Sequence, residues 1–409
     1  MNRTKLFVVL GTVAVLLCAI VWVGSAVAKE KTILVGDINP LTGKGAYWGI
    51  GAKTALDLNA EKINKAGGVT VQGETYKIKM IHEDDKYTGA AGVAAANKLI
   101  FTDKVKYLTG PLSSASVMAF QPITESNKVV LICDTYAPPE LLRGKKYTFR
   151  AITAPVHVAG PFYEWMKKKY PHMKKGAHIT PNDATGWGSA QGDNDAIVAL
   201  GMEVVANEYY ERGTEDFTPM LTRILAKGPD FFAMGGTAPG DAALIIKQAR
   251  ELGFKGVFSH IGMLDPNDIG PIAGWQNVEG VLSTAVGPVG PACPESMKAF
   301  FRNYQAKYGE INSFAPHIYD MLSILVMGMK KADSLDGDKI VEVLEKMGET
   351  REEFQTIWGK AIFGGKGLYG NNHQCLKQIL ISEIQNRKLV TVGATMPWEV
   401  PPPSVKKWR

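Results

Sequence analysis

The sequence predicts an α/β protein made of two doubly wound, parallel-sheet lobes. Three observations lead to this fold class. Short apolar runs alternate with segments whose apolar residues have helical spacing, and this alternation starts again near residue 151. The chain also has 409 residues, which is long for a single hydrophobic core. Repeated strand–helix–strand units with short loops favour parallel sheets covered by helices.

The first set of units fills residues 30–150. Strands are expected at 32–38, 76–85, 106–110 and 128–135, and helices at 49–68, 90–103 and 113–127. The first helix ends at Gly67-Gly68, which is a helix stop. The strand runs are apolar or alternate, and the helical runs are amphipathic, as a sheet with covering helices requires.

The second set of units fills residues 151–280. Helices are expected at 158–171, 188–202, 217–228 and 241–254, and strands at 176–183, 203–211, 230–236 and 256–262. Three further helices follow at 295–309, 317–333 and 339–350. From Lys360 the chain has strand-like patterning and then a proline-rich tail. Two sheets in one chain predict a cleft between them.

The N-terminus has the pattern of a secretory signal peptide at residues 1–28. Arg3 and Lys5 precede an almost wholly apolar run at 6–23, and Ala26-Val27-Ala28 forms an A-x-A site. We expect cleavage after Ala28 and a soluble, exported mature chain. An uncleaved membrane anchor is the alternative, because the run approaches the length of a bilayer span.

Composition excludes several classes of protein. The formal net charge is +6, and the basic residues are scattered without a basic-aromatic stripe, so no nucleic-acid partner is expected. The cysteines beyond the signal peptide are Cys133, Cys293 and Cys375, so at most one internal disulfide can form. Cys133 lies in an apolar strand. The sequence does not decide whether Cys293 and Cys375 form a disulfide.

No loop carries a catalytic or cofactor motif. Ser189, in GWGSAQG, lacks the last glycine of a nucleophile elbow, and LTGKGAYWG lacks the spacing of a phosphate-binding loop. HEDD at 82–85 fits either a metal site or a polar loop with a helix-capping aspartate, and we favour the loop. We therefore expect no enzyme activity, no cofactor and no metal.

A cluster of serines follows the predicted strand at 106–110. Ser113 and Ser114 open a helix, where backbone N–H groups and hydroxyls favour a negative group. Together with Thr135 they can seat a carboxylate; simple helix capping, worth about 1 kcal/mol, explains Ser113 or Ser114 equally well. Trp48 and Phe314 are aromatic residues near the opening of the predicted cleft, where they can pack against an apolar ligand.

The order and spacing of several segments resemble the branched-chain-amino-acid-binding group of periplasmic substrate-binding proteins, which serve ABC importers. The resemblance covers residues 31–390. It rests on ILVGDINPLTGKGAYWGIGAKTALDLNAEKINKAGGV, IHEDDKYTGAAGVAAANKLI, YLTGPLSSAS, CDTYAPPELL, FFAMGGTAPGDAALIIKQARELGFKG and IAGWQNVEGVLSTA. It implies a type I periplasmic binding fold with three hinge crossings. Lobe one would be 29–150 with 283–358, and lobe two 151–282 with 359–409.

The resemblance also implies a set of binding residues. Ser113, Ser114 and the backbone at Thr135 would bind the ligand carboxylate. Trp48 would cover the ligand, and Phe314 would pack against its side chain. Thr185 and Thr237 of lobe two would contact the ligand when the lobes close. Amino-acid binders of this group have tyrosines at these two positions. Gly262 stands where those binders have the acid that pairs with the α-ammonium. Asp183 and Asp265 are nearby acids that can compensate.

The sequence thus predicts a periplasmic solute-binding protein that hands a small amphipathic carboxylate to an ABC permease in the inner membrane. The ligand is either an aliphatic amino acid or a non-amino carboxylate or amide, and both stay open. The alternative function is a ligand-sensing domain of a signalling system on the same fold.

Overall fold

The computed structural model of this protein describes residues 31–400. The predicted signal peptide at 1–28, with its cleavage after Ala28, lies outside the described residues. Among residues 31–400, no helix combines the length and the apolar composition that crossing a bilayer requires.

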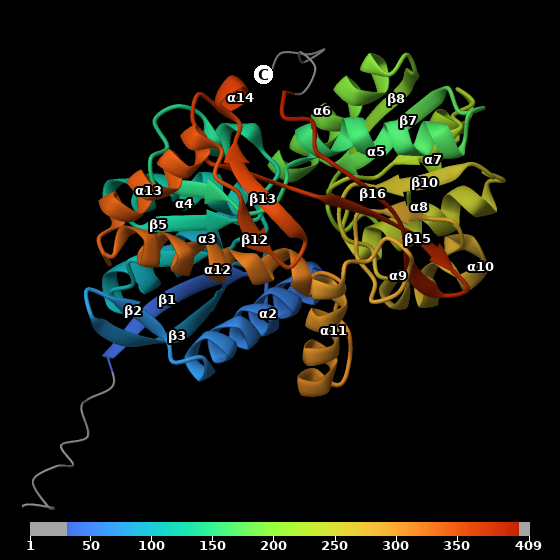
Figure 1. Cartoon of the computed structure of the whole chain (residues 1–409). Coiled ribbons are helices and arrows are strands. Elements are labelled where there is room, and N and C mark those ends of the chain that lie inside the picture. The colour runs from blue at the N-terminus through green and yellow to red at the C-terminus, as the bar shows by residue number, and fades with distance from the viewer. Residues whose placement is uncertain (1–30, 401–409) are drawn as a thin grey trace, which may run out of the picture.

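Within the described residues, the strands form two sheets, one in each lobe (Figure 1). The lobe-one sheet has the order β12-β13-β14-β6-β5-β4-β1-β3-β2, with a parallel centre from β14 to β3 and antiparallel additions at both edges. Its strands are β1 (Lys31–Asn39), β2 (Val69–Val71), β3 (Glu74–Asp84), β4 (Tyr107–Thr109), β5 (Val130–Cys133), β6 (Thr148–Arg150), β12 (Phe354–Thr356), β13 (Gly359–Gly364) and β14 (Gln374–Lys377).

The lobe-two sheet has the order β16-β15-β11-β10-β9-β7-β8. It is parallel from β11 to β8, and β15 and β16 join it in antiparallel pairs. Its strands are β7 (Lys175–Pro181), β8 (Glu203–Tyr210), β9 (Phe231–Ala233), β10 (Val257–His260), β11 (Leu282–Ser283), β15 (Ile379–Gln385) and β16 (Lys388–Thr395).

Helices cover both sheets, as the alternating pattern predicted. Lobe one carries α2 (Ala46–Lys65), α3 (Gly89–Asn97), α4 (Ser114–Ser126), α11 (Glu295–Tyr308), α12 (Ala315–Ala332), α13 (Gly337–Thr350) and α14 (Lys366–Tyr369). Lobe two carries α5 (Pro155–Lys169), α6 (Ala184–Ala199), α7 (Thr218–Leu225), α8 (Pro239–Glu251), α9 (Pro266–Ala273) and α10 (Trp275–Val278).

Strand β5 shows why these segments form a sheet with two buried faces. Val130 and Ile132 pack into the core cluster that contains residues of α2 and α12, whereas Leu131 and Cys133 pack into the cluster under α3 and α4. Successive side chains of a strand point to opposite faces, so a continuous apolar run serves helices on both sides. The predicted α/β, doubly wound architecture is confirmed.

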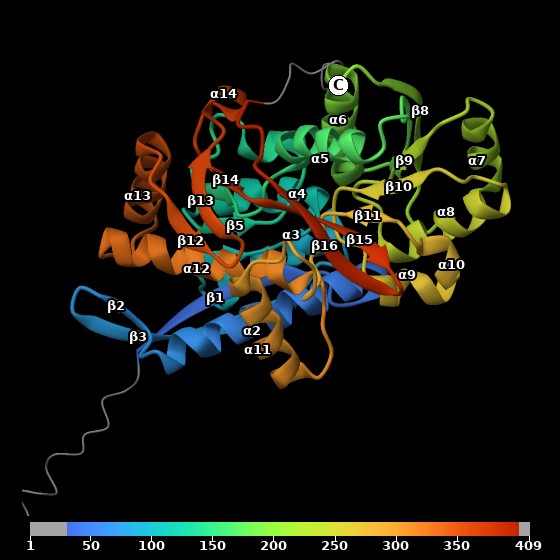
Figure 2. The ribbon, with the colours of Figure 1, turned by 45° about the vertical axis from the view of Figure 1, so that its right-hand side comes forward.

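Between residues 31 and 400 the chain crosses between the lobes three times: after β6, after β11, and between β14 and β15 (Figure 2). The first two crossings lie next to the expected boundaries at 150/151 and 282/283. The third crossing, expected at 358/359, lies instead at Gln378, which separates β14 from β15. β14 pairs with β6 through Gln374 and Arg150, so residues 359–377 belong to lobe one. The sequence pattern indicates strands here but does not say which sheet edge they join.

The three described cysteines, Cys133, Cys293 and Cys375, are free and buried. Cys293 and Cys375 belong to separate hydrophobic clusters, so the disulfide that the sequence left open is not formed.

Candidate ligand-binding cleft

The candidate site lies between the lobes, at the carboxyl ends of the central strands of both sheets. Loops after β3, β4 and β5 of lobe one meet loops after β7, β9 and β10 of lobe two, and they enclose a cavity of about 30 Å³. This is the edge where ligands of open α/β sheets bind. The volume suffices for about one or two water molecules, so the lobes are closed on each other.

Aromatic side chains form the lobe-one wall of this cavity. The ring of Trp48 lies 6.3 Å from that of Phe314 and 6.0 Å from that of Tyr87, measured between centroids. Trp48 is 7% exposed, and its buried indole N–H has no hydrogen-bond acceptor within the described part of the chain. Its place depends on Gly49, where an added Cβ would lie 2.0 Å from the carbonyl oxygen of Pro40, so α2 can approach the end of β1 closely. The wall is apolar, with one free donor.

Ser114 connects the two lobes at the start of α4. Its backbone N–H donates to the hydroxyl oxygen of Thr185 on α6, at 3.3 Å. Its own hydroxyl oxygen accepts from the backbone N–H groups of Tyr136 and Ala137, both at 3.1 Å. The hydroxyl therefore fixes the loop after β5, and the backbone N–H is the group that reaches across the cleft.

Ser113 has the other role that the sequence left open. It is the N-cap of α4, and its hydroxyl oxygen accepts from the N–H of Ser116 at 3.3 Å. The capping interpretation therefore holds for Ser113. Among the described residues, neither Ser113 nor Ser114 lines the cavity itself, and Ser114 meets it only through its hydrogen bond to Thr185.

The Thr135 side chain points into lobe one. Its hydroxyl donates to the carboxylate of Glu140 and lies 3.3 Å from the sulfur of Cys133. Glu140 forms an ion pair of 2.8 Å with Arg150, and both side chains are fully buried. A buried carboxylate requires several donors, and Thr135 supplies one. The structure thus assigns its hydroxyl to Glu140 and not to the cleft.

Of the two threonines expected to close from lobe two, the structure brings only one to the cavity. Thr185 lines it, whereas the Thr237 hydroxyl lies 3.5 Å from the carbonyl oxygen of Ile179, inside lobe two. The carbonyl of Thr237 accepts from Nε2 of His260, at 3.0 Å, and it is His260 that lines the cavity from this side.

Tyr136 is the largest feature that the sequence analysis missed. Its phenol oxygen would lie 3.1 Å from a Cβ placed on Gly262, so the tyrosine of lobe one fills the space that this glycine leaves in lobe two. Its backbone is equally close to lobe two, because a Cβ on Gly188 of α6 would lie 2.9 Å from the carbonyl oxygen of Tyr136. Thr135 of the loop CDTYAPPE was expected at the ligand, but the sequence does not reveal which side chain of the loop enters the cleft.

Asp134, in the same loop, supplies a carboxylate to the cavity. It is 5% exposed, and its Oδ2 atom makes no hydrogen bond to any residue of 31–400. Burial raises the pKa of this carboxyl to about 7, although the positive charges of Lys377 and Arg150 oppose the shift. Asp134 is therefore a buried acid without a close cationic partner.

The two acids that the sequence offered for an ammonium group are engaged elsewhere. Asp183 caps α6 and pairs with Nε of Arg212 at 2.6 Å. Asp265 caps α9 and accepts from the hydroxyl of Tyr47 at 3.0 Å. Both contacts help to hold the lobes together: Tyr47 comes from lobe one, and the Arg212 guanidinium lies 4.6 Å above the ring of lobe-one Tyr87.

A second cavity, of about 40 Å³, lies on the hinge side of Tyr136. Tyr136 and Met263 line both cavities, so these two side chains divide the space between the lobes. Lys377 contributes an ammonium group to the hinge-side cavity.

The HEDD segment forms a polar loop with protein partners. His82 lies between Asp37 and Asp57, with its ring nitrogens 2.8 and 2.9 Å from their carboxylates. Asp84 accepts from the backbone N–H of Leu41, and Asp85 from that of Tyr87, both at 2.9 Å. These side chains organise the loops around β3.

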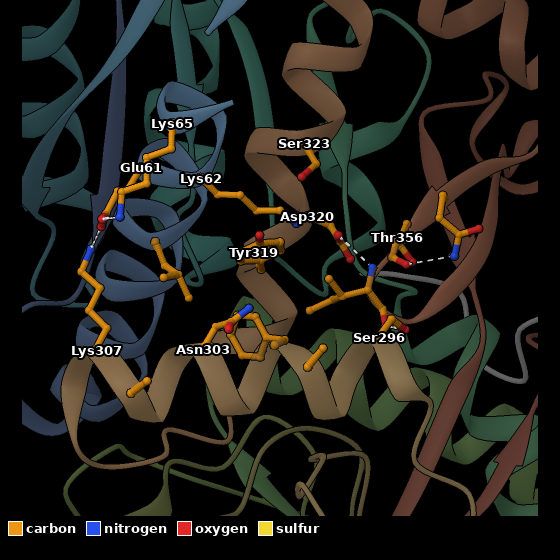
Figure 3. A pocket seen from close by; sticks show the side chains of 16 residues that line it. Glu61, Lys62, Lys65, Ser296, Asn303, Lys307, Tyr319, Asp320, Ser323 and Thr356 are labelled. Carbon is orange, nitrogen blue, oxygen red and sulfur yellow. Dashed lines mark hydrogen bonds and ion pairs between the residues drawn. The ribbon is translucent and has the colours of Figure 1, made fainter. Parts of the chain in front are cut away.

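A larger pocket, of about 850 Å³, lies on the outer side of lobe one between α2, α11 and α12 (Figure 3). Glu61 pairs there with both Lys65 and Lys307, while Lys62 extends toward Asp320. This pocket has no residue from lobe two, so lobe closure does not enclose it.

Comparisons with known proteins agree with this geometry. Residues 32–388 match the family model of the periplasmic binding proteins. A leucine-, isoleucine-, valine-, threonine- and alanine-binding protein of Pseudomonas aeruginosa is 28% identical over 342 residues, which are 82% of this chain and 87% of the relative. A Leu/Ile/Val-binding protein homologue of Brucella melitensis is 26% identical, over 78% of this chain and 84% of the relative.

Solved structures show the same fold. A leucine-binding protein from Thermotoga maritima has a TM-score of 0.77 and 23% identity, covering 90% of this chain and 99% of its own. A solute-binding protein of an ABC transporter from R. palustris, in complex with benzoate, has a TM-score of 0.75 and 20% identity, covering 91% and 99%.

These relatives and neighbours are solute-binding proteins and not enzymes, which confirms that the chain is no enzyme. The resemblance inferred from the sequence is likewise confirmed: with a family match from residue 32 to residue 388, the chain belongs to the periplasmic binding protein family.

Proposed function

We propose that this chain is the exported solute-binding component of an ABC importer. It binds a small carboxylate between its lobes in the periplasm and delivers it to a permease in the inner membrane. The observation that carries the proposal is the hydrogen bond between the Ser114 N–H and the Thr185 hydroxyl, which joins two helix N-termini across the cavity. Helix N-termini stabilise anions through free N–H groups and the helix dipole.

The mechanism follows from which lobe supplies each group. Ser114 and the aromatic wall belong to lobe one, and Thr185 and His260 belong to lobe two. A ligand touches all of them only when the lobes are closed, so binding favours the closed form. A cavity of about 30 Å³ is too small for a molecule such as leucine, so the lobes must open and Tyr136 or Met263 must move as the ligand enters.

Two ligand chemistries fit the groups around the cavity. The relative from Pseudomonas aeruginosa binds leucine, isoleucine, valine, threonine and alanine, and for an amino acid Asp134 is the carboxylate that can accept the ammonium group. The neighbour from R. palustris binds benzoate, and for an aromatic acid Trp48, Tyr87 and Phe314 supply flat apolar surface. In both cases the ligand carboxylate replaces the contact between Ser114 and Thr185.

The test is calorimetric titration of the ligand-free protein with leucine, 4-methylpentanoate and benzoate, preceded by a thermal-shift screen. A ligand at a hundredfold excess over its Kd adds about 2.7 kcal/mol to the free energy of unfolding. Thr185→Val removes the hydroxyl at nearly constant volume, and we expect roughly tenfold weaker binding, because a hydrogen bond to a charged group contributes about 1.5–3 kcal/mol.

Thr237→Val is the matched control, because this threonine also follows a lobe-two strand but lies off the cavity. It should bind as the unmodified protein does. Binding that is lost equally in both variants would contradict the site, and the absence of binding to every acid in the panel would contradict the proposed function.

A further inference from the structure

The hinge-side cavity lies where all three chain crossings between the lobes meet. It is lined by Thr153 from the first crossing, Thr284 from the second, and Lys377 and Gln378 from the third. Tyr136 and Met263 are shared with the cavity lined by Trp48 and Thr185. Movement of these two side chains would therefore join the two cavities into one elongated site.

The ammonium group of Lys377 is buried at this cavity with few polar contacts. It ends β14, it is 3% exposed, and its ammonium group makes no hydrogen bond to any residue in 31–400. The carboxylate that it approaches is that of Asp320, with 4.0 Å between Nζ and Oδ2. The ring of Trp358 lies 4.9 Å from the ammonium. An ammonium has three donors, and a buried donor without an acceptor is unfavourable.

The carboxylate of Asp320 is not available to Lys377 alone, because a second lysine, Lys62, also faces it. Its Oδ1 atom accepts from the N–H of Ile357 at 3.2 Å. On the outer side of lobe one, Lys62 extends toward the same carboxylate from α2 (Figure 3). Of the two lysines near this carboxylate, only Lys377 lines the space between the lobes.

The lining of the hinge-side cavity suits a second polar group of a ligand. Nε2 of His317 also lines it and makes no hydrogen bond to a described residue. A cation would be repelled by Lys377, whereas an anionic group would gain the three donors of the ammonium. A single water molecule also fits about 40 Å³, and it would satisfy Lys377 without any ligand.

We propose that Lys377 is a second anion subsite of the interlobe cleft and that the ligand is a dicarboxylate. One carboxylate lies at Ser114 and Thr185, the other reaches Lys377, and the Tyr136 side chain moves aside. The inference rests on the proposed function, because it uses the same cleft and the same lobe closure. It adds that selectivity between monoacids and diacids is set on the hinge side.

The experiment compares matched acids by calorimetric titration of the ligand-free protein: pentanoate with glutarate, hexanoate with adipate, and benzoate with terephthalate. The expected result is that at least one diacid binds tenfold or more tightly than its monoacid. Lys377→Met should abolish that preference and leave monoacid affinity within about twofold, and Lys377→Arg should retain it.

Lys62→Met is the matched control, because this lysine faces the same Asp320 from outside the cleft. It should keep the preference for the diacid. A purely structural role of Lys377 would lower stability in Lys377→Met without changing the ratio of diacid to monoacid affinity.

Equal affinities for monoacids and diacids in the unmodified protein would overturn the dicarboxylate inference, since a water then suffices at Lys377. That comparison needs no variant and stands even if Lys377→Met does not fold. Monoacid binding would still support the proposed function in that case. A panel without any binding would overturn both.

Discussion

The backbone N–H of Ser114 on lobe one donates to the hydroxyl oxygen of Thr185 on lobe two, at 3.3 Å. Ser114 is the first residue of α4 and Thr185 the second of α6, so two helix N-termini face each other across the closed cleft. Each brings free N–H groups and a partial positive charge. The threonine hydroxyl thus lies between two helix N-termini, where a carboxylate would be stabilised from both sides.

The approach of α6 to lobe one depends on Gly188. A Cβ at this residue would lie between 2.9 and 3.1 Å from backbone atoms of Tyr136 and Ala137, which belong to the other lobe. We predict that Gly188→Ala hinders lobe closure and weakens ligand binding by tenfold or more. The fold itself should not suffer, since alanine in a helix is favoured over glycine by about 1 kcal/mol. Small-angle scattering with saturating ligand measures closure, and calorimetry measures affinity.

Gly240→Ala is the control for this prediction. Gly240 lies in α8 of the same lobe, and an added Cβ there meets no atom within 4 Å. Both variants should unfold at or above the temperature of the unmodified protein, and only Gly188→Ala should bind weakly. Normal closure and affinity in Gly188→Ala would mean that the lobes approach each other differently when a ligand is present.

Much of the fold could be predicted from the sequence because its periodicity is strong. In β5, a run of apolar residues from Val130 to Cys133 serves two helical layers, and such runs recur in both lobes. The third crossing was misplaced because residues 359–377 show only that they form strands. Their membership of lobe one depends on pairing with β6, which is a long-range contact that no local pattern encodes.

The site was predicted less completely, because the sequence does not show which side chains of a loop point into the cleft. Trp48, Thr185 and Phe314 line the cavity as expected. Thr135 was expected beside them, but it turns to Glu140, whose burial with Arg150 creates a demand for donors that the sequence does not display. Its neighbours Asp134 and Tyr136 enter the cleft instead. In an irregular loop, a change of one residue decides which side chain points at the ligand.

His82 should make the stability of lobe one dependent on pH. Burial alone would lower its pKa, but the hydrogen bonds to Asp37 and Asp57 raise it to about 9. A histidine with a raised pKa stabilises the fold fully below its unfolded pKa of about 6.5, and the contribution is lost as the pH rises through about 9. His82→Gln should therefore lower the free energy of unfolding by on the order of 2–3 kcal/mol at pH 6, and by much less at pH 9.5.

Urea unfolding at both pH values measures this difference. His172→Gln is the control, because His172 is exposed and its replacement should change the free energy of unfolding little. An equal loss of stability in His82→Gln at pH 6 and pH 9.5 would show that the ring acts by packing and not by its charge.

Asp134 should have the opposite dependence. Burial raises its pKa from an ordinary value of 3.8 to about 7, so between pH 4 and pH 7 the folded state binds a proton that the unfolded state has lost. Stability therefore falls as the pH rises through this window and levels off above it. Asp134→Asn removes the penalty, and we expect a gain on the order of 3 kcal/mol at pH 8 and little change at pH 4.5. Thermal and urea unfolding at the two pH values measure it.

The same variant separates the two ligand chemistries. If the ligand carries an ammonium group, Asp134 is its counter-charge, and Asp134→Asn should weaken the binding of leucine at least tenfold while 4-methylpentanoate is unaffected. If the ligand is a plain acid, the neutral asparagine relieves repulsion, and 4-methylpentanoate or benzoate should bind more tightly at pH 8. Asp268→Asn is the control, because burial and Asp265 raise the pKa of Asp268 to about 7 as well, but it lies off the cavity. Asp268→Asn should change the pH dependence of stability and leave every affinity unchanged. An equal effect of both variants on binding would mean that Asp134 acts through lobe stability and not through contact with the ligand.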